Sequence, residues 1–160
     1  MIAVLADTHM PKGARRLPDR CVELIGEAEA VIHAGDFSGV SVLAELESLC
    51  LTVHAVHGNV DDPALRRALP PTLELQLGGR VVVVIHDAGP AGGRLARLRR
   101  RFPQADAVVF GHSHLPLREE QSGFQIFNPG SPTERRRAPR PSMGLLACDE
   151  GELAFEHVWL

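Results

Sequence analysis

The sequence predicts an α/β protein in which two packed β-sheets carry helices on their outer faces. In the first half of the 160 residues, apolar runs alternate with stretches of helical periodicity, which is typical of parallel strands joined by crossover helices. Those runs are apolar throughout, as expected of strands that are covered on both faces. In the second half, alternating patterns and glycine-containing turns favour antiparallel strands.

The first half contains three pairs of a strand and a helix. We expect the strands at residues 2–6, 30–34 and 52–56. Asp19 is a candidate N-cap for the first helix, and Ser38 or Ser41 for the second. Asp62-Pro63 predicts the start of the third helix, with the aspartate as cap and the proline at the first helical position.

The second half begins with alternating leucines followed by Gly78-Gly79, which together predict a hairpin. An apolar strand, a helix with an arginine-rich face and another apolar strand follow, and the arginine face is interpreted as a solvated surface. The expected elements are strands at 73–77, 81–85, 107–110, 115–120, 124–127, 143–148 and 153–158, with a helix near 91–102. The length predicts one domain over residues 1–160.

Composition argues against several classes of protein. The formal net charge of −3 disfavours a general nucleic-acid or membrane-surface binder. No apolar stretch approaches the roughly 20 residues of a membrane span, and the apolar start lacks the basic leader of a signal peptide. Cys21, Cys50 and Cys148 are widely spaced, which disfavours a disulfide framework or a zinc ribbon. We therefore expect a cytoplasmic protein.

Gly111-His112-Ser113-His114 directly follows a buried strand and is the most informative stretch of the chain. In extended backbone the two imidazoles would point to the same side, roughly 6–7 Å apart. That separation is wide for two ligands of one ion. It suits one ligand on each of two ions held about 3.5–4 Å apart.

Polar side chains also follow four other strands, at the point where each strand ends. The full set is Asp7, His9, Asp36, Asn59, His86, His112 and His114. Because ligand sites of α/β sheets lie beyond the carboxyl ends of the strands, these groups are expected to converge. Nitrogen and oxygen ligands without a thiolate suit manganese, iron, nickel or zinc. A bridging carboxylate such as Asp36 could hold two cations that activate water for attack on phosphorus.

These residues carry a family resemblance. The ordered blocks Asp7-x-His9, Gly35-Asp36, Gly58-Asn59, His86 and Gly111-His112-x-His114 resemble the calcineurin-like metallophosphoesterase superfamily. Within it, the chain is similar to the compact bacterial and archaeal phosphodiesterases that are related to the retromer scaffold subunit. The resemblance implies a four-layer αββα sandwich with two mixed β-sheets flanked by helices.

The resemblance also implies a ligand set. Asp7, His9, Asp36 and His114 would hold one divalent ion, and Asp36, Asn59, His86 and His112 the other. Mn²⁺ is the first expectation, with Fe, Ni or Zn as alternatives. The implied activity is hydrolysis of a phosphodiester by a metal-bound hydroxide, with His112, Asp36 and Asn59 as catalytic residues.

The implied substrate is a small phosphorylated molecule, with a nucleotide-like molecule among the candidates, and neither a membrane nor a general nucleic-acid partner is expected. Oligomer formation stays open. A phosphomonoesterase and a non-catalytic scaffold that retains its metal site are the two alternatives.

Two features of the implied site stay open. In many larger members, a histidine after the asparagine protonates the leaving group, whereas Val60-Asp61 follows Asn59 here; His57 or solvent could replace it. Residues 128–131 resemble the Asn-Pro-Gly-Ser loop beside the site, where Arg136 could help to position a phosphate. The arginine-rich residues 135–140 fit either a border of the site or a plain surface loop.

Overall fold

The computed structural model describes all 160 residues and contains fourteen helices and strands. They are β1 (Ile2–Leu5), α1 (Asp19–Gly26), β2 (Ala30–His33), α2 (Val40–Leu49), β3 (Val53–Ala55), α3 (Pro63–Ala68), β4 (Thr72–Leu77), β5 (Arg80–Ile85), α4 (Arg94–Arg101), β6 (Ala107–Val109), β7 (Leu117–Gln121), β8 (Phe124–Asn128), β9 (Ser142–Asp149) and β10 (Glu152–Trp159). No helix is long and apolar enough to cross a membrane.

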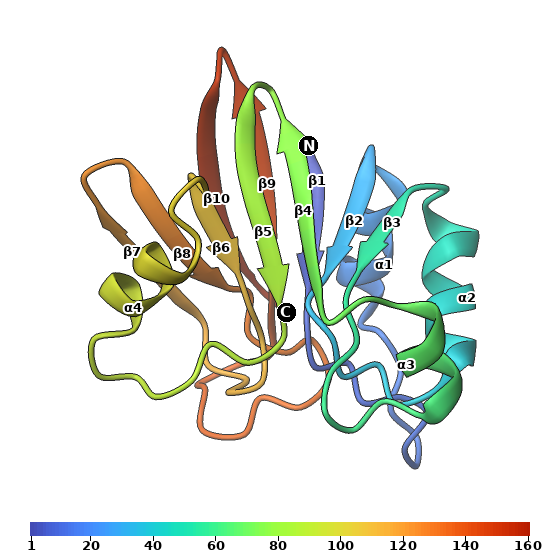
Figure 1. Ribbon diagram of the computed structural model, residues 1–160. Coiled ribbons are helices and arrows are strands. Elements are labelled where there is room, and N and C mark those ends of the chain that lie inside the picture. Colours follow the sequence, from blue (N-terminus) through green and yellow to red (C-terminus); the bar gives the residue numbers. More distant parts are fainter.

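Two five-stranded mixed sheets face each other, as Figure 1 shows. The first sheet has the order β10-β9-β1-β2-β3, with β1, β2 and β3 parallel. The second has the order β4-β5-β6-β8-β7, with β5, β6 and β8 parallel and antiparallel strands at both edges. The predicted α/β fold with two mixed sheets and outer helices is therefore confirmed.

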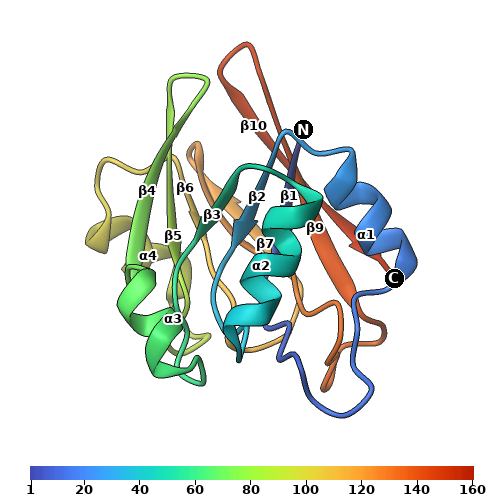
Figure 2. The same cartoon turned by 90° about the vertical axis from the view of Figure 1, so that its right-hand side faces the viewer.

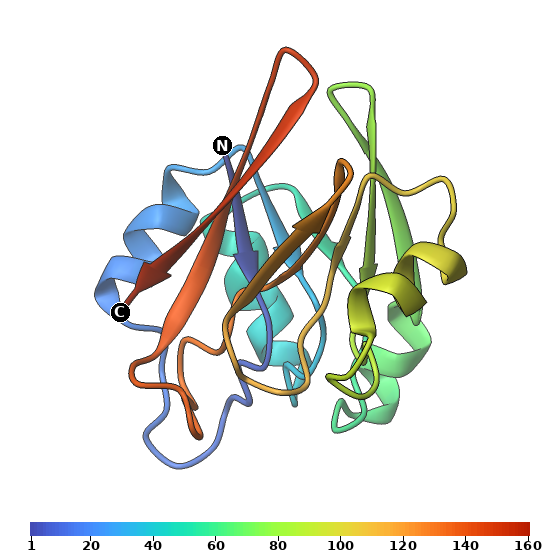
Figure 3. The ribbon, with the colours of Figure 1, turned by 90° about the vertical axis from the view of Figure 1, so that its left-hand side faces the viewer.

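Three apolar clusters hold the layers together. The cluster between the sheets includes Val4, Val84 and Phe127. A second cluster packs α1, α2 and α3 against the first sheet, and Figure 2 shows α1 and α2 in front of that sheet. A third packs α4 against the second sheet, on the side that Figure 3 presents. Burial of apolar surface on both faces of each sheet explains why the central strands are apolar throughout.

The strands do not divide between the sheets as the sequence predicts, with parallel strands in the first half of the chain and antiparallel strands in the second. β9 and β10 belong to the first sheet, where β9 pairs antiparallel with β1. In the second half of the chain, β5, β6 and β8 are parallel to one another. The predicted hairpin is present: β4 and β5 are joined by Gly78 and Gly79, whose φ angles of 55° and 81° suit a tight hairpin turn.

One of the predicted helix caps is confirmed and two are wrong. Asp62 caps α3, because its carboxylate accepts a hydrogen bond of 2.8 Å from the backbone three residues later. Asp19 is the first residue of α1 and not its cap. Neither Ser38 nor Ser41 caps α2, which starts after Gly39 without a side-chain cap. Ser38 instead lies in the preceding loop with a left-handed φ of 88°.

The arginines of α4 are less solvated than the sequence indicates. Arg97 donates hydrogen bonds to the carbonyls of Ala88 and Pro90, at 2.9 and 2.6 Å. The guanidinium of Arg94 lies over the Phe110 ring, 5.0 Å from its centre. These arginines hold the loop between β5 and α4, so part of the basic face has a structural role.

Candidate metal centre

All seven predicted ligands come together at one edge of the two sheets. They lie in loops that follow β1, β2, β3, β5 and β6, whose carboxyl ends meet there. Asp7, His9, Asp36 and Asn59 follow strands of the first sheet, and His86, His112 and His114 follow strands of the second. The side chains form two groups, each able to offer three ligand atoms within 4.8 Å of one another.

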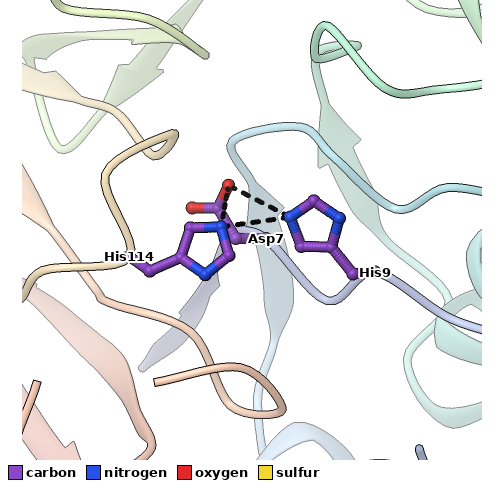
Figure 4. A group of neighbouring side chains, drawn as sticks. All are labelled: Asp7, His9 and His114. Carbon is purple, nitrogen blue, oxygen red and sulfur yellow. Dashed lines mark hydrogen bonds and ion pairs between the residues drawn. The ribbon is translucent and has the colours of Figure 1, made fainter. Parts of the chain in front are cut away.

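The first group contains Asp7, His9 and His114, which converge in Figure 4. The Nε2 atoms of the two histidines lie 3.1 Å apart. Asp7 Oδ1 lies 3.4 Å from Nε2 of His114 and 3.8 Å from Nε2 of His9. All three side chains are buried.

The second group contains Asp36, His86 and His112. Nε2 of His86 lies 3.2 Å from Asp36 Oδ2, and it lies 3.3 Å from Nδ1 of His112. The carbonyl oxygen of the Asn59 side chain lies 3.1 Å from His86 Nε2 and 2.9 Å from His112 Nδ1. Asn59 therefore lies beside both histidines of this group. The ligation of metal by these seven residues stays a prediction.

Backbone carbonyls determine the tautomers of two histidines. Nδ1 of His86 lies 2.7 Å from the carbonyl of Ala34, and Nδ1 of His114 lies 2.6 Å from the carbonyl of Glu134. Because a carbonyl only accepts, each Nδ1 carries the proton and donates it. When such a ring is neutral, its lone pair is on Nε2, which faces the ligand group; this is the usual arrangement of metal-binding histidines.

Burial and neighbouring charges separate the two carboxyl groups electrostatically. Burial raises the pKa of Asp7 from 3.8 to about 8. Burial also acts to raise the pKa of Asp36, but the hydrogen bond and charge of His86 outweigh it and hold that pKa at about 2. Burial lowers the pKa of His114 to about 4 and lowers that of His9 as well. The first group thus keeps its histidines neutral at physiological pH.

The backbone of the ligand loops differs from the predicted extended conformation. His112 and His114 have φ angles of 67° and 59°, in the left-handed region. Asp7, His9 and Asp36 share that region, with φ angles of 56°, 44° and 61°. The conformation is rare for residues with a Cβ and turns the chain sharply at each strand end. The two histidines face different ligand groups because of this turn, and not because of strand spacing.

Glycines before the ligands let the strand ends approach closely. A Cβ on Gly111 would lie 2.8 Å from both Asp7 Oδ2 and the Cβ of Ala6. A Cβ on Gly58 would overlap the Asp36 side chain and backbone. The glycine in these strand-end blocks is therefore a steric requirement of the site.

Asp61 organises the site, and sequence reasoning missed it. Its Oδ2 accepts hydrogen bonds from the backbone N–H groups of Asp36 and Gly58, at 3.0 and 2.7 Å. Its Oδ1 accepts one from Ser38 at 2.8 Å, and the residue is buried. It thus ties the loop after β2 to the loop after β3. The following proline identifies Asp62 as a helix cap, but no sequence signal indicates that Asp61 binds the two ligand loops.

The loop at residues 128–131 lies beside the site, as the resemblance implied. Asn128 donates hydrogen bonds to the carbonyl of Gly111 and to Oγ of Ser113, at 2.9 and 3.1 Å. The hydroxyl of Ser131 donates to the carbonyl of Asp7 at 2.8 Å. This loop therefore binds the ligand loops that follow β1 in the first sheet and β6 in the second.

The seven side chains fit a pair of divalent ions. Asp7 Oδ2 is buried without a hydrogen-bond partner, which is costly unless a cation or another donor meets it. Nε2 of His114 lies 3.1 Å from Nε2 of His9, and because Nδ1 of His114 donates to Glu134, the lone pair on its Nε2 is available to a cation. The donor set is nitrogen and oxygen without sulfur, which suits the first-row divalent metals.

Comparison with known proteins agrees with this geometry. A family model described as the calcineurin-like phosphoesterase superfamily domain matches residues 1–151. A probable metallophosphoesterase of Methanothermobacter thermautotrophicus is 32% identical over 158 residues, covering 98% of this chain and 90% of that relative. The solution structure of a Thermotoga maritima protein is 29% identical, with a TM-score of 0.78 over 99% of this chain and 98% of that one.

Two more distant relatives have different names. One is a phosphodiesterase of Methanocaldococcus jannaschii, 24% identical and covering 81% of this chain and 82% of its own. The other is vacuolar protein sorting-associated protein 29 of Schizosaccharomyces pombe, 28% identical and covering 83% and 72%. The match over nearly the whole chain and the two ligand groups lead to one conclusion: the chain belongs to the calcineurin-like phosphoesterase superfamily.

Proposed function

We propose that this protein is a dinuclear metal-dependent phosphodiesterase. The position of Asp36 carries the proposal. Its Oδ2 lies 3.2 Å from Nε2 of His86 in the second group and 3.7 Å from Nε2 of His9 in the first. A carboxylate between two ligand groups is suited to bridge two cations, and its low pKa keeps it ionised for that role.

Two divalent ions, when bound, lower the pKa of water and stabilise both the attacking and the leaving oxygen of an in-line displacement at phosphorus. Asp7, His9 and His114 would hold one, and Asn59, His86 and His112 the other, with Asp36 shared. We favour Mn²⁺, with Fe, Ni and Zn as alternatives, on the chemistry of the donors. His112 and Asn59 are the two exposed ligands, and His112 is the exposed one with an imidazole ring that can meet substrate.

A diester with a good leaving group fits the site best. Val60 occupies the position where larger relatives have a proton-donating histidine, and Nδ1 of His57 lies 3.3 Å from the carbonyl of Gly58. The phosphodiesterase relative from Methanocaldococcus jannaschii supports the diester. The proposal includes a small, nucleotide-like phosphorylated substrate, a cytoplasmic location, and neither a membrane nor a general nucleic-acid partner; an oligomer is compatible with it.

The test is hydrolysis of an activated aryl phosphodiester by the purified protein, with Mn²⁺ and then other divalent ions. We expect turnover that depends on added metal and that stops with a chelator. Asp36→Asn should abolish turnover, whereas His54→Ala, on β3 outside the ligand set, should retain it. Folded protein without activity toward any diester, with any of the metals, would contradict the proposal.

Two alternatives have their own readouts. A phosphomonoesterase would cleave aryl monoesters in preference to diesters under the same conditions. A scaffold is favoured by the relative named vacuolar protein sorting-associated protein 29. Metal content alone does not separate scaffold from enzyme, because Vps29 of Entamoeba histolytica, which shares this fold, is described as complexed with zinc. Hydrolysis of either ester class decides the question.

A further inference from the structure

Arg136 is a cation beside the ligand groups that no carboxylate neutralises. Its Nη1 lies 3.4 Å from the backbone carbonyl of the ligand His112, and it has no ion pair. Two other arginines lie near this edge, and both have partners: Arg15 is paired with Glu134 at 3.0 Å, and Arg66 donates hydrogen bonds to the backbone carbonyls of Asn59 and Asp61. Arg136 is also exposed, so its guanidinium is free to accept another partner.

The backbone on both sides of Arg136 is fixed. The preceding carbonyl of Glu134 accepts the hydrogen bond from Nδ1 of the ligand His114. Arg135 closes a turn with Ala138, because its carbonyl accepts from the Ala138 N–H and its own Nη1 donates to the Ala138 carbonyl, both at 2.8 Å. Arg136 lies within this turn with a left-handed φ of 47°. The Arg136 guanidinium therefore extends from a hydrogen-bonded turn whose backbone also binds the ligand His114.

The guanidinium of Arg136 lies beside the ligand loops, because its Nη1 contacts the backbone carbonyl of the ligand His112. A positive charge at this edge repels any cation that the ligand groups hold. The same charge attracts an anion that lies against the ligand groups.

We propose that Arg136 binds a non-bridging oxygen of a phosphoryl group that lies against the two ligand groups, and so orients the substrate; this rests on the proposed phosphoesterase function. The planar guanidinium can donate two parallel hydrogen bonds to phosphate oxygens. The proposed ligand is therefore a phosphate ester or inorganic phosphate. Arg136 would recognise the negatively charged oxygens of the phosphoryl group.

The test measures two affinities, each on the same variants. Isothermal titration calorimetry gives the affinity of the metal-free protein for Mn²⁺ and the affinity of the Mn²⁺-loaded protein for inorganic phosphate. We expect Arg136→Ala to weaken phosphate binding by about 10- to 100-fold, the loss of a charge-assisted pair. The same change should leave Mn²⁺ binding unchanged or tighten it by about two- to fivefold, because a repulsive charge is removed.

Three matched variants separate recognition from a structural effect. Arg137→Ala removes a neighbouring exposed arginine and should leave both affinities unchanged. Arg135→Ala loosens the turn but keeps the Arg136 guanidinium, so its effect on phosphate should be smaller than that of Arg136→Ala. Arg136→Lys keeps the positive charge but lacks the two parallel donors of a guanidinium. Its affinity for phosphate should lie between those of the wild type and Arg136→Ala.

Several outcomes would overturn the inference. They are an Arg136→Ala protein that binds phosphate like Arg137→Ala, a parallel loss of Mn²⁺ and phosphate affinity, or a metal-loaded wild type that binds no phosphate. Failure of the proposed function looks different. If the wild type hydrolyses no ester but loses phosphate binding on Arg136→Ala, the inference stands and the enzyme proposal fails.

Discussion

Asp36 lies beside one histidine of each ligand group, whereas the two histidines beside Asp7 both belong to the first group. Asp36 Oδ2 lies 3.7 Å from His9 Nε2 and 3.2 Å from His86 Nε2. His9 belongs only to the first group. Loss of the shared carboxylate should therefore act on both metal positions, whereas loss of His9 should act on one.

We predict that Asp36→Asn lowers metal content to well below one ion per chain. His9→Ala should retain close to one ion, because the second group stays complete. His54→Ala, a histidine outside the ligand set, is the control and should match the wild type. Metal content by mass spectrometry after gel filtration measures this. Equal losses in Asp36→Asn and His9→Ala would show that Asp36 does not bridge.

At the scale of elements, the site depends on how the loop after β2 is tied to the loop after β3. Asp61 accepts three backbone N–H groups from these two loops, and it is buried. The adjacent Asp62 has a different task, because it caps α3 through one backbone N–H. The two aspartates are neighbours in the sequence but support different parts of the fold.

We predict that Asp61→Asn lowers the free energy of unfolding by about 1–3 kcal/mol, because an amide N–H₂ would face backbone N–H groups that need an acceptor. Asp62→Asn is the matched control and should change stability by only a few tenths of a kcal/mol, since asparagine is an equally good N-cap. Urea unfolding of the metal-free protein provides the measurement. Equal effects of both substitutions would contradict the role of Asp61.

At the scale of the whole molecule, the ligands connect the two sheets. Asp7, His9, Asp36 and Asn59 follow strands of one sheet, and the other three ligands follow strands of the second. Bound ions would therefore link the two sheets, while the metal-free protein buries Asp7 with an unpartnered oxygen. Stability without metal should depend on the protonation of Asp7.

The direction of that pH dependence follows from the raised pKa of Asp7, about 8 against 3.8. Between these two values the native state holds a proton that the unfolded chain has released, so stability decreases as the pH rises. We predict that Asp7→Asn makes the metal-free protein more stable at pH 8 by an amount on the order of a few kcal/mol, and changes little at pH 4.

With added Mn²⁺ at pH 8, the wild type should become more stable than Asp7→Asn, because metal binding at its complete site stabilises the native state. Asp149→Asn, an exposed carboxylate on β9, is the control and should follow the wild type. Urea midpoints with chelator and with Mn²⁺ provide the data. A metal-free Asp7→Asn protein that is less stable than the wild type at both pH values would contradict the prediction.

Much of the fold was predictable from local patterns. Continuous apolar runs identified the central strands, and Gly78-Gly79 identified the hairpin between β4 and β5. The sequence placed the starts of α1 and α2 to within one or two residues but assigned them the wrong caps, since neither helix has a side-chain cap. Local patterns also could not predict which sheet contains β9. That assignment depends on the pairing of β9 with β1, which lies near the other end of the chain.

By itself the sequence determined which residues could serve as ligands, because polar groups directly after apolar strands must gather at the carboxyl edge of parallel sheets. Only the tertiary structure decided how they meet. The left-handed turns at His112 and His114, the three hydrogen bonds accepted by Asp61 and the position of Arg136 depend on contacts between loops that are distant in sequence. Such contacts form once the two sheets have packed, so no local pattern records them.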